Sequence, residues 1–520
     1  MKYPIGIQTF RDIREGGYAY VDKTAFVYDL VKGGKYYFLS RPRRFGKSLL
    51  VSTLDAYFRG KKELFKGLAI DSLETDWTEY PVLHLDLSNA NYDSGEILKT
   101  KLKLHVDEWV RDLGLEHIEA DEASRFGVVI RRAYEKTGRK VVILVDEYDA
   151  PLVNLIDKEE LLEINRDTLS GFYKNIKAND QYIQFAFLTG VTKFGQLSVF
   201  SALNNLEDIS LDKHYQSVCG ITEDELHAYF DEGVEDMAEE NEIPKEECYG
   251  RLKKMYDGYH FCKKGMGIYN PFSLLNALKS RNFGSYWFQT GTPTALIKAL
   301  KNNNVDITEL PGRSINPVRL ANVNSYQKDL TALLYQSGYL TISGESESGY
   351  LTVDFPNEEV RIGFYNQLLP IYTSMSGDDV DCRVDALRLA LIHGEVEAFI
   401  DEMRAVIASL QYQFFKLEEQ AFQFIFSITG SLVGGKDLRT DAERRTNRGR
   451  IDLLVETRAY IYVMEFKLNQ SPEAALQQIH ERGYAEPWQS DPRQKILLGV
   501  NFSSEERNIP EGGWQMETEA

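Results

Sequence analysis

Residues 37–48 read YFLSRPRRFGKS, and this stretch decides how the first part of the chain folds. A short apolar strand over residues 36–39 runs into a tight loop, and a helical run begins at Lys47 and Ser48. This layout is typical of a phosphate-binding loop (P-loop), in which backbone N–H groups and the positive end of a helix dipole face a phosphate. With Gly46 before the helix, Lys47 would reach the β- and γ-phosphates and Ser48 a nucleotide-bound Mg²⁺.

The loop departs from the usual pattern at one position. That pattern has a glycine five residues before Gly46, where this chain has Arg41. The turn must therefore form without the residue that tolerates a positive φ. On the loop alone, a strand-to-helix turn with solvated basic residues explains the stretch as well as a nucleotide site does.

A second stretch, residues 141–149, reads VVILVDEYD. A run that is apolar on both faces is typical of the middle of a parallel sheet, and carboxylates at its end lie where open α/β sheets bind ligands. We expect Asp146 to hold Mg²⁺ and Glu147 to orient and polarise the attacking water. With a P-loop upstream, this interpretation outweighs the alternative of a buried strand that ends in a polar turn.

Two further strands support a P-loop ATPase with an extra strand between the lysine and the acid. One covers residues 82–87, and the other covers residues 183–188 and ends on Thr189. A polar residue at that end would sense the γ-phosphate, so we expect this role of Thr189. Arg43 and Arg44 could contact phosphates in their own chain or in a neighbouring subunit, and the second alternative requires a homo-oligomer.

The composition bounds the class of protein. At 520 residues the chain is long for one domain, and about two to four are expected. No apolar stretch is long enough for a membrane span, and the N-terminus lacks the apolar core of a signal peptide. The four cysteines have no paired spacing, which fits a reducing compartment. We therefore expect a cytoplasmic protein without a membrane partner. The net charge of −19 argues against bulk nucleic-acid binding but leaves room for a basic groove.

Changes in pattern along the chain predict an α/β multidomain protein in three parts. Residues 1–215 alternate strands and helices around a P-loop NTPase parallel sheet. Residues 216–410 are mostly helical and rich in aromatic residues, which we interpret as core. Within this part, residues 327–361 read as a helix and a β-hairpin, compatible with a winged-helix module that binds DNA or only links domains. The link is favoured because these residues are not basic. Residues 411–520 form a last α/β unit with an acidic tail after Ser503 that we expect to be exposed or mobile.

A second group of polar residues lies in the last unit. Residues 460–467 read YIYVMEFK, and the side chains of Glu465 and Lys467 leave the same face of this strand. An antiparallel pairing with the preceding strand would bring Asp452 beside Glu465. Two carboxylates could hold Mg²⁺, and Lys467 would help to activate the water that attacks a phosphodiester.

Two residues outside these strands complete the predicted second site. Glu419 begins the helix before the strands, and its carboxylate could reach the same centre. Gln478, on the helix after them, could orient water or phosphate. An exposed edge strand also carries Glu-x-Lys pairs, but the apolar residues on the same face make that alternative a poor fit, because burying an acid and a lysine among them would be costly.

Several short motifs are together similar to those of one protein family. They are YVDKT (20–24), RPRRFGKS (41–48), VDEYD (145–149), LTGVTK (188–193) and YNPFS (269–273). They resemble the prokaryotic AAA-ATPase-like family, in which the missing first glycine of the P-loop is usual. Members of this family typically end in a PD-(D/E)XK nuclease-superfamily domain with a restriction-endonuclease-like fold. The motifs that resemble this nuclease core are GRID (449–452), MEFK (464–467) and ALQQIH (475–480).

These motifs lead to one expected function and two alternatives. The expected function is an ATP-binding and ATP-hydrolysing protein that regulates or drives a Mg²⁺-dependent nuclease acting on nucleic acid, with DNA favoured. In the first alternative, the last domain binds nucleic acid or protein without cutting it. In the second, both sites are relics in a scaffold protein.

Overall fold

The structure of this chain is a computed structural model. It describes every residue except 154, 156–157, 194–205, 289–299, 301–309, 324–329, 412–421, 423–424, 426–427, 431, 435–437, 447–448 and 520, and for residues 442–446 it describes the backbone alone. The chain divides into two compact units, residues 1–299 with 311–360 and residues 300–310 with 361–520. Among the described helices, none has the length and apolar character to cross a membrane. All four cysteines are free.

A parallel sheet of five strands forms the centre of the first unit, as the sequence predicts. Its strands are β1 (Tyr36–Ser40), β2 (Val82–Asp86), β3 (Val141–Asp146), β4 (Ile183–Gly190) and β5 (Glu207–Asp208). Their order in the sheet is β2-β3-β4-β1-β5, and every registered pair is parallel. The strand with the acidic residues is therefore separated from the P-loop strand by β4, and β3 is buried along its whole length.

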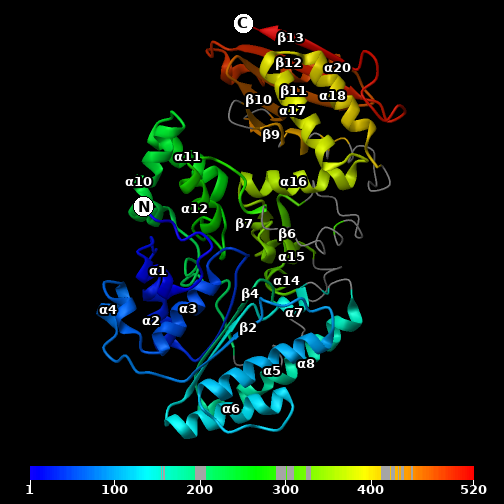
Figure 1. The fold of residues 1–520 in the computed structure, drawn as a ribbon. Helices are drawn as coiled ribbons and strands as arrows, with labels where there is room; N and C mark the ends of the chain where they lie inside the picture. The colour runs from blue at the N-terminus through cyan, green and yellow to red at the C-terminus, as the bar shows by residue number, and fades with distance from the viewer. Residues whose placement is uncertain are drawn as a thin grey trace. The chain divides into compact units, whose positions relative to one another are not determined.

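Helices cover this sheet through apolar residues at helical spacing. They are α1 (Phe10–Gly16), α2 (Thr24–Gly33), α3 (Lys47–Phe58), α4 (Ala69–Leu73), α5 (Gly95–Asp112), α6 (Glu122–Thr137), α7 (Ala150–Val153) and α8 (Glu159–Ala178). In α5, for example, Leu98, Leu102, Val106 and Trp109 are buried on one face. α5, α6 and α8 pack against one another as a group (Figure 1).

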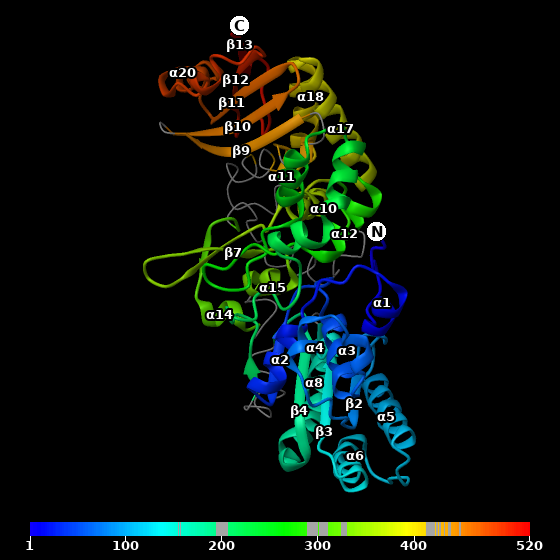
Figure 2. The ribbon, with the colours of Figure 1, turned by 90° about the vertical axis from the view of Figure 1, so that its left-hand side faces the viewer.

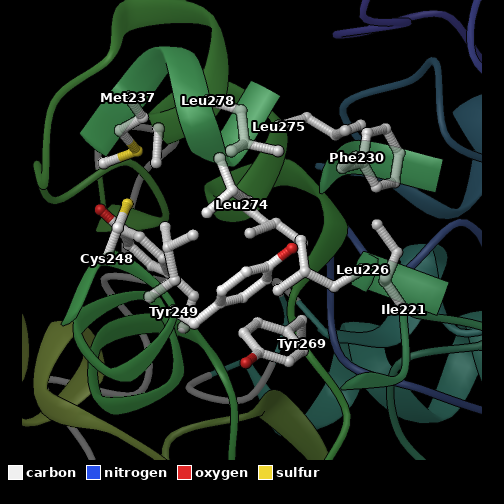
Figure 3. Close-up of a cluster of buried hydrophobic side chains, with 14 of the residues drawn as sticks. Ile221, Leu226, Phe230, Met237, Cys248, Tyr249, Tyr269, Leu274, Leu275 and Leu278 are labelled. Atoms are coloured by element: carbon white, nitrogen blue, oxygen red, sulfur yellow. The ribbon is translucent and has the colours of Figure 1, made fainter. Parts of the chain in front are cut away.

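Three helices of the middle region enclose the core shown in Figure 3. They are α10 (Glu223–Glu240), α11 (Lys245–Tyr256) and α12 (Pro271–Ser280). Two of these helices have side-chain caps: Thr222 and Glu225 form a capping box at α10, and Asn270 caps α12 just before Pro271. Tyr249 and Tyr269 point into the cluster in Figure 3, which confirms that these aromatic residues are core.

The helix followed by a hairpin is confirmed, and it belongs to a small three-stranded sheet. The elements are β6 (Arg313–Ile315), α14 (Pro317–Ala321), α15 (Leu330–Ser337), β7 (Thr341–Glu345) and β8 (Leu351–Asp354), with strand order β6-β8-β7. β6 was not expected, because three mostly exposed residues carry no alternating pattern. Leu333, Leu334 and Gln336 of α15 are buried. A winged helix reads DNA through an exposed helix, so the burial of α15 favours the packing interpretation of this module.

The second unit contains two helices followed by a mixed sheet. Its elements are α17 (Gly377–His393), α18 (Val396–Ala408), β9 (Leu438–Thr446), β10 (Gly449–Thr457), β11 (Tyr460–Leu468), α20 (Pro472–Arg482), β12 (Gln494–Phe502) and β13 (Trp514–Glu519), and α16 (Glu358–Tyr372) crosses the boundary between the two units. The sheet order is β13-β12-β11-β10-β9 (Figure 2), with β11 and β12 parallel and the other pairs antiparallel. α20 makes the crossover that a parallel pair requires.

The sequence predicts that the tail after Ser503 is exposed or mobile. Its last part is indeed mostly exposed, but it forms a strand that the sequence analysis did not predict. Residues 514–519 pair with β12 as the edge strand β13, although most of this strand is exposed. Residues 514–518 alternate Trp and Met with polar residues, and this alternation is the pattern in the sequence that indicates a strand. The high acidity of the segment obscured it.

Gly258 offers a stability test of the first unit. Its φ is 94°, and a Cβ there would lie 2.0 Å from the carbonyl oxygen of Pro356. Gly258→Ala should therefore add a backbone clash to left-handed strain and destabilise the unit by roughly 3 kcal/mol. Gly312→Ala is the control, since Gly312 has φ 75° and no atom within 4 Å of a Cβ. It should cost only about 1 kcal/mol. Equal urea midpoints for the two variants would contradict the clash.

Candidate functional site

The P-loop joins β1 to α3 with an open helix N-terminus. Arg44 and Gly46 have left-handed backbones, with φ 71° and 92°. Gly46 is the N-cap residue of α3, and no side chain caps this helix. The first N–H groups of α3 therefore remain available to an anion.

Lys47 is buried at the start of α3, with 4% of its surface exposed. Its Nζ donates a hydrogen bond to the carbonyl oxygen of Pro42 at 3.3 Å. The same Nζ lies 3.3 Å from Oε1 of Glu147. The structure thus brings together the lysine of the P-loop and the second acid of the β3 end, two residues that the sequence places far apart.

Asp146 is buried at the end of β3. Its pKa is raised to about 6, mainly by burial and also by the charge of Glu147, against the lowering effect of a hydrogen bond with Ser48 and of the charge of Lys47. Asp146 thus lies near Ser48, the second residue of α3. The two predicted residues of the P-loop, Lys47 and Ser48, and the two predicted acids, Asp146 and Glu147, therefore lie at one edge of the sheet.

Asp86 is a further acid at this edge that the sequence analysis missed. It ends β2 and stands opposite Asp146 in the parallel register, and its charge contributes to the raised pKa of Asp146. Its backbone neighbour Leu87 donates to the carbonyl oxygen of Asp146 at 3.2 Å. The signal was present in the sequence, because Asp86 ends a strand in the same way as Asp146, but the neighbouring order of β2 and β3 was not readable.

Glu147 sits on a strained backbone that its neighbours hold in place. Its φ is 51°, in the left-handed region. Beyond it, Tyr148 donates from its backbone N–H to Thr189 O at 3.0 Å. Asp149 is wholly buried and accepts hydrogen bonds from the backbone of Val191 and from the backbone and hydroxyl of Thr192. The loop after β3 is thereby joined to the end of β4.

Three other predicted residues lie around the loop without meeting Lys47. The Thr189 hydroxyl donates to the carbonyl oxygen of Leu39 at 2.8 Å, and the residue is wholly buried. This contact joins β4 to β1, so the geometry gives no support to a role in sensing the γ-phosphate. Arg43 is exposed, and the guanidinium of Arg44 lies 4.3 Å from the ring centre of Phe272.

A cavity of about 100 Å³ lies beside Gly46. Its walls come from the N-terminal segment, from α3 and from the middle region, and they are mostly apolar, with Tyr20, Leu50, Val218 and Leu275 among the lining residues. The cavity is therefore next to the P-loop and shaped by three stretches of sequence.

The YVDKT motif holds the N-terminal wall of this cavity. The Lys23 Nζ donates to both carboxylate oxygens of Glu225, at 2.6 and 2.7 Å. Asp22 accepts hydrogen bonds from the backbone of Thr24 and of Ala69. The motif thus ties the segment before α2 both to α10 and to α4.

The second candidate site lies on β10, β11 and α20. The registered pair Leu453 and Met464 makes Asp452 and Glu465 the next antiparallel partners. The Lys467 Nζ lies 3.3 Å from Oε1 of Glu465 and donates to Oε1 of Gln478 at 2.5 Å. Gln478 in turn donates from Nε2 to Oε1 of Glu465. Four of the five predicted residues are thus neighbours.

Glu465 has the features of a cation ligand. It is only 2% exposed, and its Oε2 is buried without a hydrogen-bond partner among the described residues. Burial raises its pKa to about 7, and the charge of Asp452 adds to this effect while Lys467 opposes it. An orphaned carboxylate oxygen next to a second acid is the arrangement that a hard divalent cation would satisfy. The residues present therefore fit a Mg²⁺ or Mn²⁺ ion.

Glu419 lies outside the described residues, so its predicted approach to this centre stays a prediction. Arg450 is exposed at the start of β10, next to the site. Within the described part of the chain, no group of three or more His, Cys, Asp or Glu side chains is placed to hold a metal ion. Among the described residues, Asp452 and Glu465 are the carboxylates that would hold a cation at the second site, and water or substrate would supply further ligands.

Comparison with known proteins agrees with this arrangement. The chain matches the family models described as "Predicted AAA-ATPase", over residues 4–200, and "PD-(D/E)XK nuclease superfamily", over residues 417–512. It is 35% identical over 519 residues to a protein of Azotobacter chroococcum mcd 1 described as "Uncharacterized protein in vnfD 5'region", and the match covers 98% of each chain. This chain therefore belongs to the AAA-ATPase-like family, with a PD-(D/E)XK nuclease-superfamily domain at its end.

Proposed function

We propose that this protein binds and hydrolyses ATP with Mg²⁺ at the P-loop and uses the nucleotide to regulate or drive a metal-dependent nuclease in its second unit. The observation that carries the proposal is the meeting of Lys47 with Glu147, beside the buried Asp146. A lysine, a hydroxyl and two acids at the carboxyl edge of a parallel sheet, next to an uncapped helix N-terminus, are the groups that phosphoryl transfer requires.

The nucleotide's phosphates would take the place of the present partners of Lys47. Its Nζ would leave Pro42 O and Glu147 for phosphate oxygens, and the N–H groups at the start of α3 would bind the same phosphates. Mg²⁺, held by Ser48 and Asp146, supplies neutralisation of the developing phosphate charge. Once released from Lys47, Glu147 can orient the attacking water and accept its proton.

The apolar cavity beside Gly46 is the place we propose for the nucleobase. It adjoins the P-loop, and stacking and burial of a flat purine suit its aromatic and aliphatic walls. Since the Lys23–Glu225 pair fixes one wall, the base would contact the N-terminal segment and the middle region together.

In the second unit, we propose hydrolysis of a phosphodiester in nucleic acid. Asp452 and the orphaned oxygen of Glu465 would hold the divalent ion, which supplies Lewis-acid activation of water and phosphate. Lys467, oriented by Gln478, would stabilise charge on the phosphate in the transition state. Arg450 would attract the nucleic-acid backbone. Because cutting requires metal and the described residues supply only two carboxylates, binding without cutting is the competing function.

The first prediction concerns the two roles at the P-loop. Lys47→Ala should abolish ATP binding, because it removes the charge that meets the phosphates. Glu147→Gln should keep binding and slow hydrolysis about 10²–10⁴-fold, the usual contribution of a general base. Calorimetry and phosphate release measure the two effects. Hydrolysis by Glu147→Gln at the wild-type rate would overturn the assignment of Glu147, and wild-type protein that binds no nucleotide would overturn the ATP site.

The second prediction concerns separability of the two sites. Asp452→Asn should abolish cutting of nucleic acid, and Lys467→Ala should slow it while keeping metal binding. Both variants should retain wild-type ATP turnover, since the two sites lie on different units. Cleavage is measured on assorted DNA and RNA substrates with Mg²⁺ or Mn²⁺, with and without ATP. Glu473→Gln, an exposed acid in the first turn of α20, is the control.

Two outcomes of this assay would count against the nuclease. Undiminished cutting by Asp452→Asn would place the activity elsewhere or in a contaminant. Wild-type protein that binds nucleic acid in every nucleotide state but never cuts it would establish the non-cutting alternative.

The third prediction is a pH dependence of metal binding. The pKa of Glu465 is raised to about 7 in the metal-free protein. Below pH 7 a proton therefore occupies the carboxylate and competes with the cation, so Mn²⁺ affinity should fall by about tenfold per pH unit between pH 7 and 5. Titrations followed by electron paramagnetic resonance measure this. Glu465→Gln should bind Mn²⁺ weakly at all pH values. A flat profile in the wild type would show that Glu465 is not a ligand.

A further inference from the structure

Arg41 stands where a P-loop usually has its first glycine, and its side chain is buried. Only 1% of its surface is exposed. Its Nη1 donates to the carbonyl oxygens of Ser40 and Ser210, at 2.9 and 2.8 Å, and its Nη2 donates to the carbonyl oxygen of Tyr215 at 3.1 Å. The guanidinium also lies 4.1 Å from the ring centre of Phe261. Arg41 thus points away from the phosphate concavity and into the segment after β5 and the middle region.

Burial of this charge needs a reason. Removing a guanidinium from water is costly, and carbonyl oxygens and one aromatic ring compensate for it only in part. Burial accordingly lowers the pKa of Arg41, and within the part of the chain that the structure describes its Nε is buried without a hydrogen-bond partner. Asp208, an acid whose charge reaches Arg41, is ion-paired to Lys193. Stability alone does not favour an arginine here over a smaller residue.

The backbone does not need a glycine at this position either. Arg41 has no positive φ; within the loop the left-handed residues are Arg44 and Gly46. The backbone at position 41 would therefore tolerate a glycine, but a glycine has no side chain to make the hydrogen bonds of Arg41. The side chain of Arg41, and not local backbone freedom, fixes the first residue of the loop.

The rest of the loop is anchored to the same region. The ring of Phe45 packs edge to face on Tyr259 and Phe261, at 4.8 and 5.3 Å between centres. The backbone N–H of Gly220 donates to the carbonyl oxygen of Phe45 at 3.1 Å. Residues 210–261 thus hold the loop at both Arg41 and Phe45.

We propose that Arg41 is a positioning residue that couples nucleotide binding at the P-loop to the segment of residues 210–215 and to the loop of residues 259–261. The inference rests on the proposed nucleotide site. Arg41 itself contacts no phosphate. It holds the P-loop N–H groups in the binding arrangement, and binding in turn holds the middle region against the loop, because the coupling between two sites is reciprocal. The ATP site is then complete only while the middle region is docked on it.

The test compares Arg41→Gly, which restores the usual P-loop sequence, with Arg41→Lys. Nucleotide affinity is measured by calorimetry, and amide hydrogen exchange is followed at residues 210–215 and 259–261 with and without an ATP analogue. We expect Arg41→Gly to lose at least tenfold in affinity and to lose the nucleotide-induced protection of both segments. Arg41→Lys keeps the charge and reaches fewer carbonyl groups, so its affinity should lie between those of wild type and Arg41→Gly.

Arg388 in α17 provides the matched control. Its guanidinium also donates to three backbone carbonyl groups, those of Leu432, Val433 and Gly434, but in the second unit. Arg388→Lys should leave nucleotide affinity and the exchange of both segments unchanged. If Arg41→Gly does not fold, Phe261→Leu replaces it, since this variant keeps an apolar side chain and removes the ring under the guanidinium. It should weaken the nucleotide-induced protection.

The outcomes separate this inference from the function on which it rests. Wild-type affinity and protection in Arg41→Gly, or in Phe261→Leu if the glycine variant is unfolded, would overturn the coupling while leaving the ATP site intact. The coupling would also be overturned if Arg388→Lys lowered nucleotide affinity and protection as much as Arg41→Lys does. The loss of any arginine that binds backbone carbonyl groups would then have the same effect. Wild-type protein that does not bind nucleotide would overturn the ATP site itself.

Discussion

Parallel pairing of β1, β4 and β3 is the constraint on which the first unit depends. Parallel strands direct their carboxyl ends to the same edge, so the residues that follow β1 meet those that follow β3 although about a hundred positions separate them. β4 lies between the two and sets the distance that the loops must bridge. Lys47 and Glu147 meet across it. Tyr148 donates a hydrogen bond to Thr189 in β4, and the carboxylate of Asp149 accepts one from Thr192 just after β4, so the acidic loop is held at that place. The geometry of the site thus follows from strand order and hydrogen bonding in the sheet.

In the second unit, a different pattern of strand pairing also brings acidic residues close to a lysine. An antiparallel ladder places Asp452 next to Glu465, and a parallel crossover through α20 brings Gln478 over the same face. In both units, one buried acid lies near a lysine and a second carboxylate, and the pKa of this acid is raised by burial and by the neighbouring carboxylate. A cation relieves such a pair of like charges, so divalent-ion binding and the geometry of each acid pair depend on each other.

Much of this could be read from the sequence where apolar runs were long. VVILV before Asp146 and YIYVM before Glu465 identify buried strands and the faces of their last residues. Strand order could not be read, so Asp86 went unnoticed beside Asp146. The sequence also does not show in which direction a side chain near a strand end points. Thr189 is expected to sense the γ-phosphate, but its hydroxyl instead donates a hydrogen bond to β1 within the sheet. The short strand β6 carries no alternating pattern, and in β13 the acidity of the segment obscured the alternation of Trp514 and Met516 with polar residues. The side chain of Arg41 finds its partners far along the chain, in residues that no local rule connects to the loop.

The edge strand β13 bears on how copies of this chain meet. It leaves one row of backbone groups without a neighbouring strand in the described sheet, the kind of edge that invites a strand from another molecule. Its residues Glu517 and Glu519 carry like charges on one face. Antiparallel contact between two such edges would set these carboxylates near each other, which disfavours the pairing. These carboxylates thus disfavour extension of the sheet from one copy of the chain to another through β13.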